Sequence, residues 1–288
     1  MEPQATEPRR GTSVLPFTKV QGLGNHFVLV WEPEVGTRDW GQLALDVCRH
    51  HFAVGADGLL VASPSAVAHV RMRYYDPDGT EDMCGNGLRC VAKWASLRGH
   101  AAPEMTVETL AGLRRCVVLG TGEVCAEMGE PVLDTSRLPA IAPVDRLLDY
   151  PVEVNGRTYP ITGVSLGTTH VVIIGQDRSG PPWAEDSAAL EVHPMFPDKT
   201  TVDWVEVAAS DHILVRPWER RLGETLACGT GACASTVATV LHGLTDRRVR
   251  VEMKGGSLLV EWREDNHVTA TGRAEIVYQG TYYPEPWL

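Results

Sequence analysis

The sequence predicts a protein of the α/β (α+β) class with two pseudo-symmetric domains, each a largely antiparallel sheet or barrel around a central helix. Two copies of one motif, Met83–Gly87 (MCGNG) and Ala227–Gly231 (ACGTG), place their cysteines 144 residues apart, half of the 288-residue chain. Other segments repeat at the same offset. Strand patterns dominate both halves, and a helical pattern follows each motif. One thiol from each half indicates a functional site in the cleft between the domains.

The repeat extends beyond the cysteine motifs. Further segments align at an offset of 143 or 144 residues: Leu23–Val28 with Leu166–Val171, Phe52 with Phe196, Arg73–Asp76 with Arg216–Glu219, and Glu81 with Glu224. Chance is a poor account of so many ordered matches. We therefore expect domains at 14–142 and 150–288, with a final strand that can cross back to the first domain. Residues 1–13 are polar and contain proline, and we expect a disordered tail there.

Strand patterns recur along both halves, mostly separated by Gly, Pro or Asp. The expected strands are 27–30, 58–62, 70–74, 105–108, 116–119, 171–174, 204–207, 213–215, 249–253 and 258–262. Helical periodicity is strongest at 87–97 and 231–241, directly after the two cysteine motifs. We therefore expect each central helix to begin at its cysteine.

Charge and apolar content argue against two classes of partner. A net charge of −11 disfavours nucleic acid, which needs a basic surface to neutralise its phosphates. No apolar run approaches the ~18 residues of a membrane span. Residues 1–13 also lack the apolar segment of a secretory signal. We expect a cytoplasmic protein with a small-molecule partner, and without nucleic-acid or membrane partners.

Seven cysteines are an odd number without the spacing of a disulfide scaffold, so reduced thiols are expected. No His cluster accompanies Cys84 or Cys228, which disfavours a metal site. The other five cysteines lack the motif and are expected to be packing residues: Cys48, Cys90, Cys116, Cys125 and Cys233.

Each motif places a cysteine where a helix is expected to begin. Unpaired N–H groups and the helix dipole stabilise a thiolate there, so its pKa can fall from ~8.5 toward neutrality. Gly85 and Gly229 let backbone amides approach a ligand, and two such helix ends suit an α-carboxylate. Cys84 and Cys228 are therefore candidate catalytic residues, a base and an acid on opposite faces of one Cα. We expect one thiolate and one thiol, exchanged at each turnover.

Several ordered motifs carry a resemblance to one family. They are Phe17–Lys19, Gly22–Asn25, His51–Gly58, Met83–Cys90, Val164–Gly167 with His170, Trp218–Arg220, Gly223–Thr225 and Leu226–Cys233. From Phe17 onward the chain resembles the diaminopimelate epimerase family, the cofactor-independent epimerases of lysine and cell-wall biosynthesis. The resemblance implies an isomerase that needs no pyridoxal phosphate and inverts Cα with two bases. The nearest family activity is LL- to meso-diaminopimelate epimerisation.

The resemblance also implies roles for individual residues, with no cofactor and no metal. Cys84 and Cys228 match the acid/base pair. Binding positions are implied for the reacting α-carboxylate (Gly85, Asn86, Gly229 and Thr230), for the amino group and cleft (Asn25, His170 and Glu219) and for a distal carboxylate (Arg220). Taken alone, Asn25 and His170 are more typical of a turn and of a core residue. Glu219 and Arg220 alone would be an ordinary surface pair.

The chain departs from the family at the distal end of the substrate. Members that act on diaminopimelate place three asparagines there, and this chain has Asp76, Thr168 and Thr201 at the corresponding places. The stretch that contains Asp76 is also one residue shorter than in those members. An amide both donates and accepts, whereas an ionised carboxylate only accepts. Asp76 would therefore repel a distal carboxylate and favour a cation or an amino group.

The departure leaves alternatives open. One is a racemase of another amino acid, with a polar or cationic side chain directed toward Asp76, Thr168 and Thr201. Proline-racemase-like activity is less favoured, because those relatives carry Cys-Gly-His-Gly where this chain has Cys84–Gly87. A thiol redox sensor or a non-catalytic binding module is a hypothesis from another class. The sequence does not reveal the amino acid used, which cysteine serves which enantiomer, or whether a homodimer forms.

Overall fold

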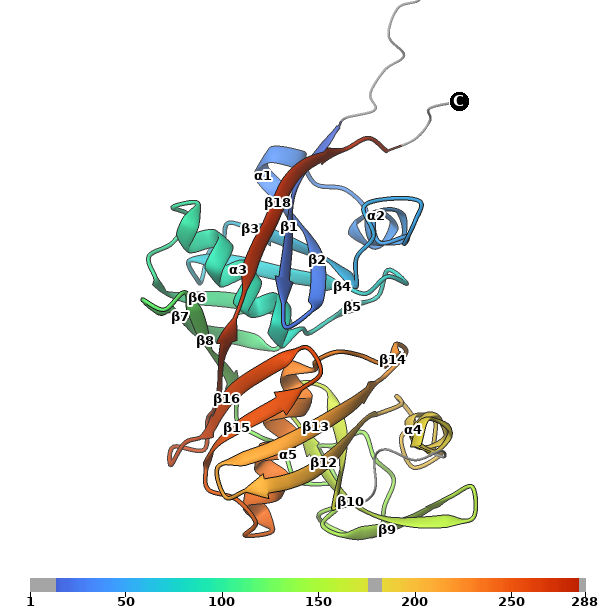
Figure 1. Ribbon diagram of the computed structural model, residues 1–288. Helices are drawn as coiled ribbons and strands as arrows, with labels where there is room; N and C mark the ends of the chain where they lie inside the picture. Colours follow the sequence, from blue (N-terminus) through green and yellow to red (C-terminus); the bar gives the residue numbers. More distant parts are fainter. Residues whose placement is uncertain (1–13, 176–182, 285–288) are drawn as a thin grey trace, which may run out of the picture.

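The computed structural model describes residues 14–175 and 183–284. It contains two similar halves, one above the other in Figure 1. The first half comprises β1 (Leu15–Gly22), β2 (Asn25–Trp31), α1 (Glu32–Val35), α2 (Trp40–Val47), β3 (Gly58–Ser63), β4 (Val70–Tyr75), β5 (Glu81–Asp82), α3 (Gly85–Leu97), β6 (Glu104–Thr109), β7 (Gly112–Val118) and β8 (Glu123–Gly129).

The second half follows the same order, with an additional strand at its start and one helix where the first half has two. It comprises β9 (Tyr150–Val154), β10 (Arg157–Ser165), β11 (Thr169–Ile174), α4 (Trp183–Glu191), β12 (Thr201–Ala209), β13 (His212–Glu219), β14 (Gly223–Glu224), α5 (Gly229–Leu241), β15 (Arg248–Met253), β16 (Gly256–Trp262) and β17 (Val268–Arg273). The chain then continues into β18 (Glu275–Tyr282).

The strands of the two halves pair in the same pattern. In the first half β1–β2, β3–β4, β6–β7 and β7–β8 are antiparallel, while β2–β3 and β4–β6 are parallel. In the second half β10–β11, β12–β13, β15–β16 and β16–β17 are antiparallel, while β11–β12 and β13–β15 are parallel. The fold is therefore of the predicted mixed α/β class, with two pseudo-symmetric and largely antiparallel halves.

Two pairings connect the halves. β8 pairs antiparallel with β17, which makes the sheets of the two halves continuous. β18 leaves the second half and pairs antiparallel with β1, and Figure 1 shows it running along the first half. Edge strands that find partners in this way leave fewer unpaired backbone groups. The domain bounds 14–142 and 150–288 remain a prediction.

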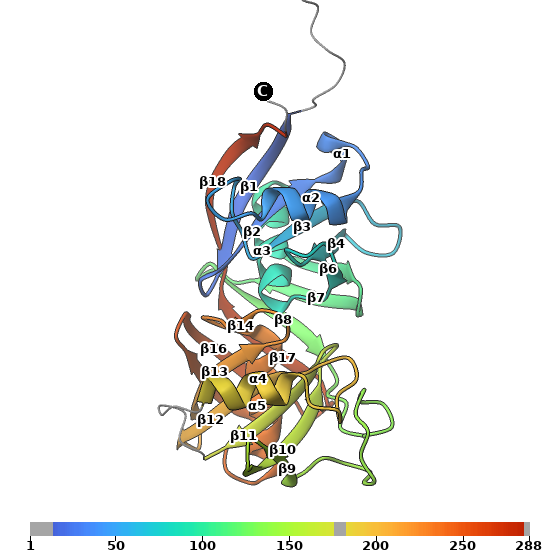
Figure 2. The same ribbon diagram turned by 90° about the vertical axis from the view of Figure 1, so that its right-hand side faces the viewer.

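A central helix fills the curve of each sheet. Leu88 and Val91 of α3 are fully buried, as are Val237 and Ala238 of α5. Their side chains belong to one apolar cluster that extends through both halves. On the outer faces, α2 and α4 occupy corresponding places, both turned to the viewer in Figure 2. Burial of the apolar surface between each central helix and its sheet therefore holds the helix in place.

The predicted elements are confirmed where apolar periodicity is strong. Each expected strand overlaps an observed one, and both central helices begin directly after their cysteines. Strands with mixed or exposed side chains carry no such signal, and β18 is exposed or half-buried throughout. The short helices α1, α2 and α4 were also not predicted.

The tail expected at residues 1–13 lies outside the described residues. Within the described ranges, no helix combines the length and apolar character needed to cross a membrane.

The predicted packing role of the remaining cysteines agrees with their burial. Cys48, Cys90, Cys116 and Cys233 are buried, and Cys125 on β8 is half-buried. All seven cysteines are free thiols in the structure.

Candidate active site

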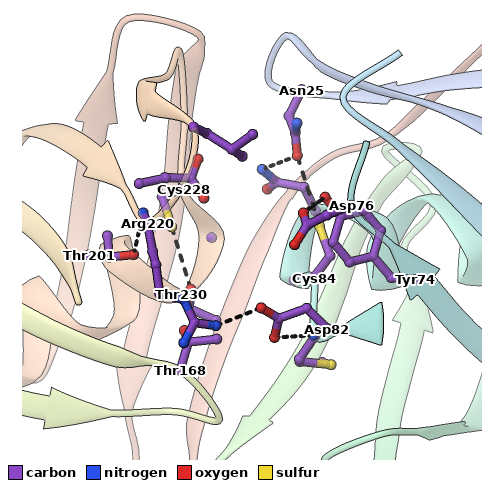
Figure 3. A pocket seen from close by; sticks show the side chains of 16 residues that line it. Asn25, Tyr74, Asp76, Asp82, Cys84, Thr168, Thr201, Arg220, Cys228 and Thr230 are labelled. Carbon is purple, nitrogen blue, oxygen red and sulfur yellow. Dashed lines mark hydrogen bonds and ion pairs between the residues drawn. The ribbon is translucent and has the colours of Figure 1, made fainter. Parts of the chain in front are cut away.

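A pocket lies where the N-termini of α3 and α5 meet between the two halves (Figure 3). Its walls contain every predicted site residue except His170: Asn25, Asp76, Cys84, Gly85, Asn86, Thr168, Thr201, Glu219, Arg220, Cys228, Gly229 and Thr230. Tyr74, Asp82, Met83 and Leu222 also line it and were not predicted. The repeat therefore brings two distant segments of the chain to one cavity.

Cys84 and Cys228 are the N-cap residues of α3 and α5. Each has an extended backbone, and its sulfur accepts a hydrogen bond from a backbone N–H of the first helical turn. The N–H of Gly87 lies 3.3 Å from Sγ of Cys84, and that of Gly231 lies 3.3 Å from Sγ of Cys228. This is the geometry of a helix cap with sulfur in place of oxygen. Each half thus supplies one sulfur to the pocket (Figure 3).

The acidity of the two thiols differs from the sequence expectation. Burial is the largest influence and raises the pKa of Cys84 and of Cys228 above that of an ordinary thiol. The hydrogen bond from the first helical turn lowers each pKa but does not offset burial. Glu219 raises the pKa of both thiols further through its negative charge. The expected depression of the thiol pKa is therefore not found, because desolvation outweighs the helix end.

The two helix ends lie close together because glycine follows each cysteine. A Cβ added to Gly229 would lie 3.2 Å from Oδ1 of Asn86 and 3.4 Å from its backbone nitrogen. The Asn86 side chain donates to Oδ1 of Asn25 and to the carbonyl of Ala227, both at 3.2 Å. The N–H groups of each first helical turn have no helical partner of their own and can receive an anion.

Asn25 is held beside the first sulfur by an acidic residue that sequence reasoning missed. Its Nδ2 donates to Oδ2 of Asp57 at 2.9 Å, and the backbone N–H of His26 donates to the same oxygen at 2.9 Å. This orients Oδ1 of Asn25 toward Sγ of Cys84, 3.9 Å away. Asp57 lies in a motif noted in the sequence, but no local pattern links it to Asn25.

Glu219 stands beside the second sulfur. Its carboxylate accepts a hydrogen bond from the Thr225 hydroxyl and one from the Cys228 thiol. Burial raises the pKa of Glu219 to about 7, and the two hydrogen bonds act in the opposite direction. A carboxyl group with this pKa changes its charge near neutral pH.

His170 lies behind the pocket wall and is fully buried. Its Nδ1 is 2.7 Å from Oδ2 of Asp203, and its Nε2 is 3.0 Å from Oγ1 of Thr168. Of these three residues, only Thr168 lines the pocket. His170 therefore reaches the pocket through the Thr168 hydroxyl.

The remaining wall carries an ion pair between the halves. Nη2 of Arg220 lies 2.6 Å from Oδ2 of Asp82, which ends β5 two residues before Cys84. The backbone N–H of Arg220 donates to Oγ1 of Thr201 at 3.2 Å. Asp76 accepts a hydrogen bond from the Tyr74 hydroxyl at 2.7 Å, and burial raises the pKa of Asp76. The sequence contains the Asp82 carboxylate, but its partner Arg220 lies in the other half of the chain.

The fold and its pocket define a class of two-domain proteins. The chain is similar to a hydroxyproline epimerase from Agrobacterium vitis, with a TM-score of 0.71 and 14% identity, covering 96% of this chain and 94% of that one. It is also similar to a PhzF-family phenazine biosynthesis protein from Bacillus anthracis, with a TM-score of 0.67 and 16% identity, covering 93% and 99%. These structures share the fold of this chain.

Sequence comparison identifies the family. The diaminopimelate epimerase model matches residues 17–133 and 162–277. Proteins named diaminopimelate epimerase are 46% identical in Pelotomaculum thermopropionicum, over 92% of this chain and 98% of that protein, and 43% identical in Desulfovibrio desulfuricans, over 93% and 98%. The chain belongs to the diaminopimelate epimerase family. It is an isomerase of the amino-acid epimerase type, and these relatives do not favour the alternative activities.

Proposed function

We propose that the protein converts LL-diaminopimelate to the meso form by inverting one Cα, with Cys84 and Cys228 as the base and the acid. The observation that carries the proposal is the pair of sulfurs. Each caps the N-terminus of a helix, and both helices begin at one shared pocket. The names of the relatives support the choice of substrate and a role in lysine biosynthesis. We further propose that residues 14–142 and 150–288 are the domains that supply one sulfur each.

The reaction is a proton exchange at one carbon. A thiolate removes the α-proton from one face, and the thiol on the other face donates its own proton, which leaves the two sulfurs in exchanged states. The α-carboxylate binds the N–H groups at the two helix ends, including those of Asn86 and Thr230. These dipoles stabilise the negative charge that develops at Cα and the carboxylate. This electrostatic support takes the place of an electron-accepting cofactor.

Substrate binding also changes the acidity of the thiols. Burial favours the protonated form of both thiols, and the negative charge of Glu219 acts in the same direction. The α-ammonium group of the substrate is a cation that can pair with Glu219. A positive charge close to the sulfurs lowers the pKa that burial has raised, so a thiolate forms when substrate is bound.

The setting of the reaction follows from its chemistry. Two free thiols need a reducing compartment, and we place the enzyme in the cytoplasm on this ground. A homodimer is a further proposal, which sedimentation of the purified chain tests by its mass.

Exchange of the α-proton in D2O, followed by NMR, tests the substrate. The panel contains LL- and meso-diaminopimelate and the common L-amino acids, and the double variant Cys84→Ala/Cys228→Ala, which lacks both proposed bases, is the blank. Exchange on diaminopimelate, absent in the blank, is the expected result. Exchange on another amino acid, without exchange on diaminopimelate, would overturn the proposed substrate but not the proposed role of the thiols.

A further inference from the structure

The ion pair between Arg220 and Asp82 crosses the pocket from one half of the protein to the other. Nη2 of Arg220 and Oδ2 of Asp82 are 2.6 Å apart, and their side chains are 18% and 20% exposed. Among the described residues that line the pocket, Arg220 is the only cationic one, whereas Asp76, Asp82 and Glu219 carry carboxyl groups. A ligand that brought only a carboxylate to Arg220 would compete with Asp82 for the same cation and would leave Asp82 without a counter-ion.

The Thr168 hydroxyl adds an acceptor to this region. The Asp203 carboxylate can only accept, so the hydrogen of the 2.7 Å contact belongs to Nδ1 of His170. Nε2 of the same ring lies 3.0 Å from Oγ1 of Thr168. A hydroxyl oxygen has two lone pairs, so whichever atom donates in this contact, Thr168 Oγ1 keeps at least one for a ligand in the pocket. Thr168 therefore presents an acceptor to the pocket.

Asp82 differs from the neighbouring carboxyl groups in its hydrogen-bond partner. Asp76 accepts a hydrogen bond from the Tyr74 hydroxyl at 2.7 Å. Glu219 is engaged beside Cys228 at the reacting end. The partner of Asp82 is Arg220, whose guanidinium also donates to the carbonyl of Asp198 at 3.2 Å. In Figure 3 the pair lies with Thr168 on one side of the pocket, and Asn25 lies on the other.

We propose that Asp82 is a specificity-determining residue, which receives the ammonium group at the non-reacting end of the substrate together with Thr168, while Arg220 receives the carboxylate at that end. The inference rests on the proposed function, because diaminopimelate carries both groups there. Asp82 and Arg220 neutralise each other in the structure. The substrate exchanges this one ion pair for two, so neither protein charge is left buried without a partner.

The test compares two ligands that differ at one group. LL-diaminopimelate carries the distal ammonium group, and L-2-aminopimelate replaces it with hydrogen and keeps the carboxylate. The KM for diaminopimelate is measured by α-proton exchange, and the inhibition constant of 2-aminopimelate is measured against that exchange. The variants are Asp82→Asn and Thr168→Val. Glu81→Gln is the matched control, because Glu81 adjoins Asp82 but is exposed and bonded to the Tyr75 hydroxyl.

Asp82→Asn is expected to raise the KM for diaminopimelate by about tenfold or more, without raising the inhibition constant of 2-aminopimelate. Thr168→Val is expected to act in the same direction and keeps the test usable if the first variant does not fold. A similar change for both ligands, or no change for either, would overturn the inference. A wild-type enzyme inactive on diaminopimelate would instead overturn the proposed substrate.

Discussion

Asn86 of α3 donates a hydrogen bond from its side-chain amide to the backbone carbonyl of Ala227, 3.2 Å away in the other half. Ala227 immediately precedes Cys228, so this bond ties one cysteine motif directly to the other. Arg89 in turn donates to the Asn86 side chain and is fully buried. The separation of the two helix ends is therefore set by a polar contact inside the protein, before any substrate arrives.

Replacing Gly229 by alanine tests this close approach. The added methyl would lie 3.2 Å from Oδ1 of Asn86 and 3.4 Å from its backbone nitrogen, so Asn86 must shift by a few tenths of an ångström. We expect kcat/KM to fall by roughly tenfold to a hundredfold, because small misplacements of reacting groups are costly. Gly120→Ala is the control, since nothing lies within 4 Å of its added Cβ. Equal activity of the two variants would show that the spacing of the helix ends is not critical.

Removing either of the two sulfurs proposed as acid and base should abolish epimerisation. Loss of a general acid or base costs about 10²–10⁴ in rate, and we expect Cys84→Ala and Cys228→Ala to lose at least that. Cys125→Ala, a half-buried thiol outside the pocket, should stay active. Rates of meso product formation and thermal melting of each variant check the prediction. A single variant that still epimerises at the wild-type rate would remove the two-base assignment.

At substrate concentrations below KM, the rate of epimerisation should rise as the pH passes through about 7. Glu219 has a pKa raised to about 7, so it is neutral below that pH and ionised above it, where it can pair with the α-ammonium group. We expect KM to fall as the pH rises from 6 to 8. Glu219→Gln should flatten this dependence. If Glu219→Gln shows the same dependence of KM on pH as the wild type, the pH dependence belongs to another group.

Stability should show the opposite trend from the same residue. A raised pKa means that the folded state binds more protons than the unfolded one between about 4.5 and about 7. The contribution of Glu219 to stability is therefore complete below its unfolded pKa and is lost as the pH rises through about 7. Denaturant titrations should show wild type losing free energy of unfolding, relative to Glu219→Gln, across this range. A difference independent of pH would contradict the raised pKa.

Asp57 is expected to act as a positioning residue through Asn25. Asp57→Asn replaces the charged acceptor of Asn25 Nδ2, at 2.9 Å, by a neutral amide oxygen, which weakens the hold on the Asn25 amide beside Cys84. We expect kcat to fall by about tenfold with little change in KM, because the substrate contacts remain. Asp78→Asn, an exposed carboxylate outside the pocket, is the control. A rise in KM with unchanged kcat would argue against positioning.

The sequence could locate what is encoded locally or repeated. The duplicated motif predicts that Cys84 and Cys228 begin helices and line one pocket, and both do. The direction of the thiol pKa shift could not be predicted, because burial of Cys84 depends on the whole fold. The contact between Asp82 and Arg220 joins two halves, and a pattern read along one chain segment does not contain it.

The return of β18 to β1 has a consequence for how the protein is made. The strand Leu15–Gly22 is synthesised long before one of its partners, Glu275–Tyr282. The first half must therefore wait, with an unpaired strand edge, until that later strand has been made. Such distant pairing slows folding, and it makes the nascent chain a natural client for chaperones during that interval.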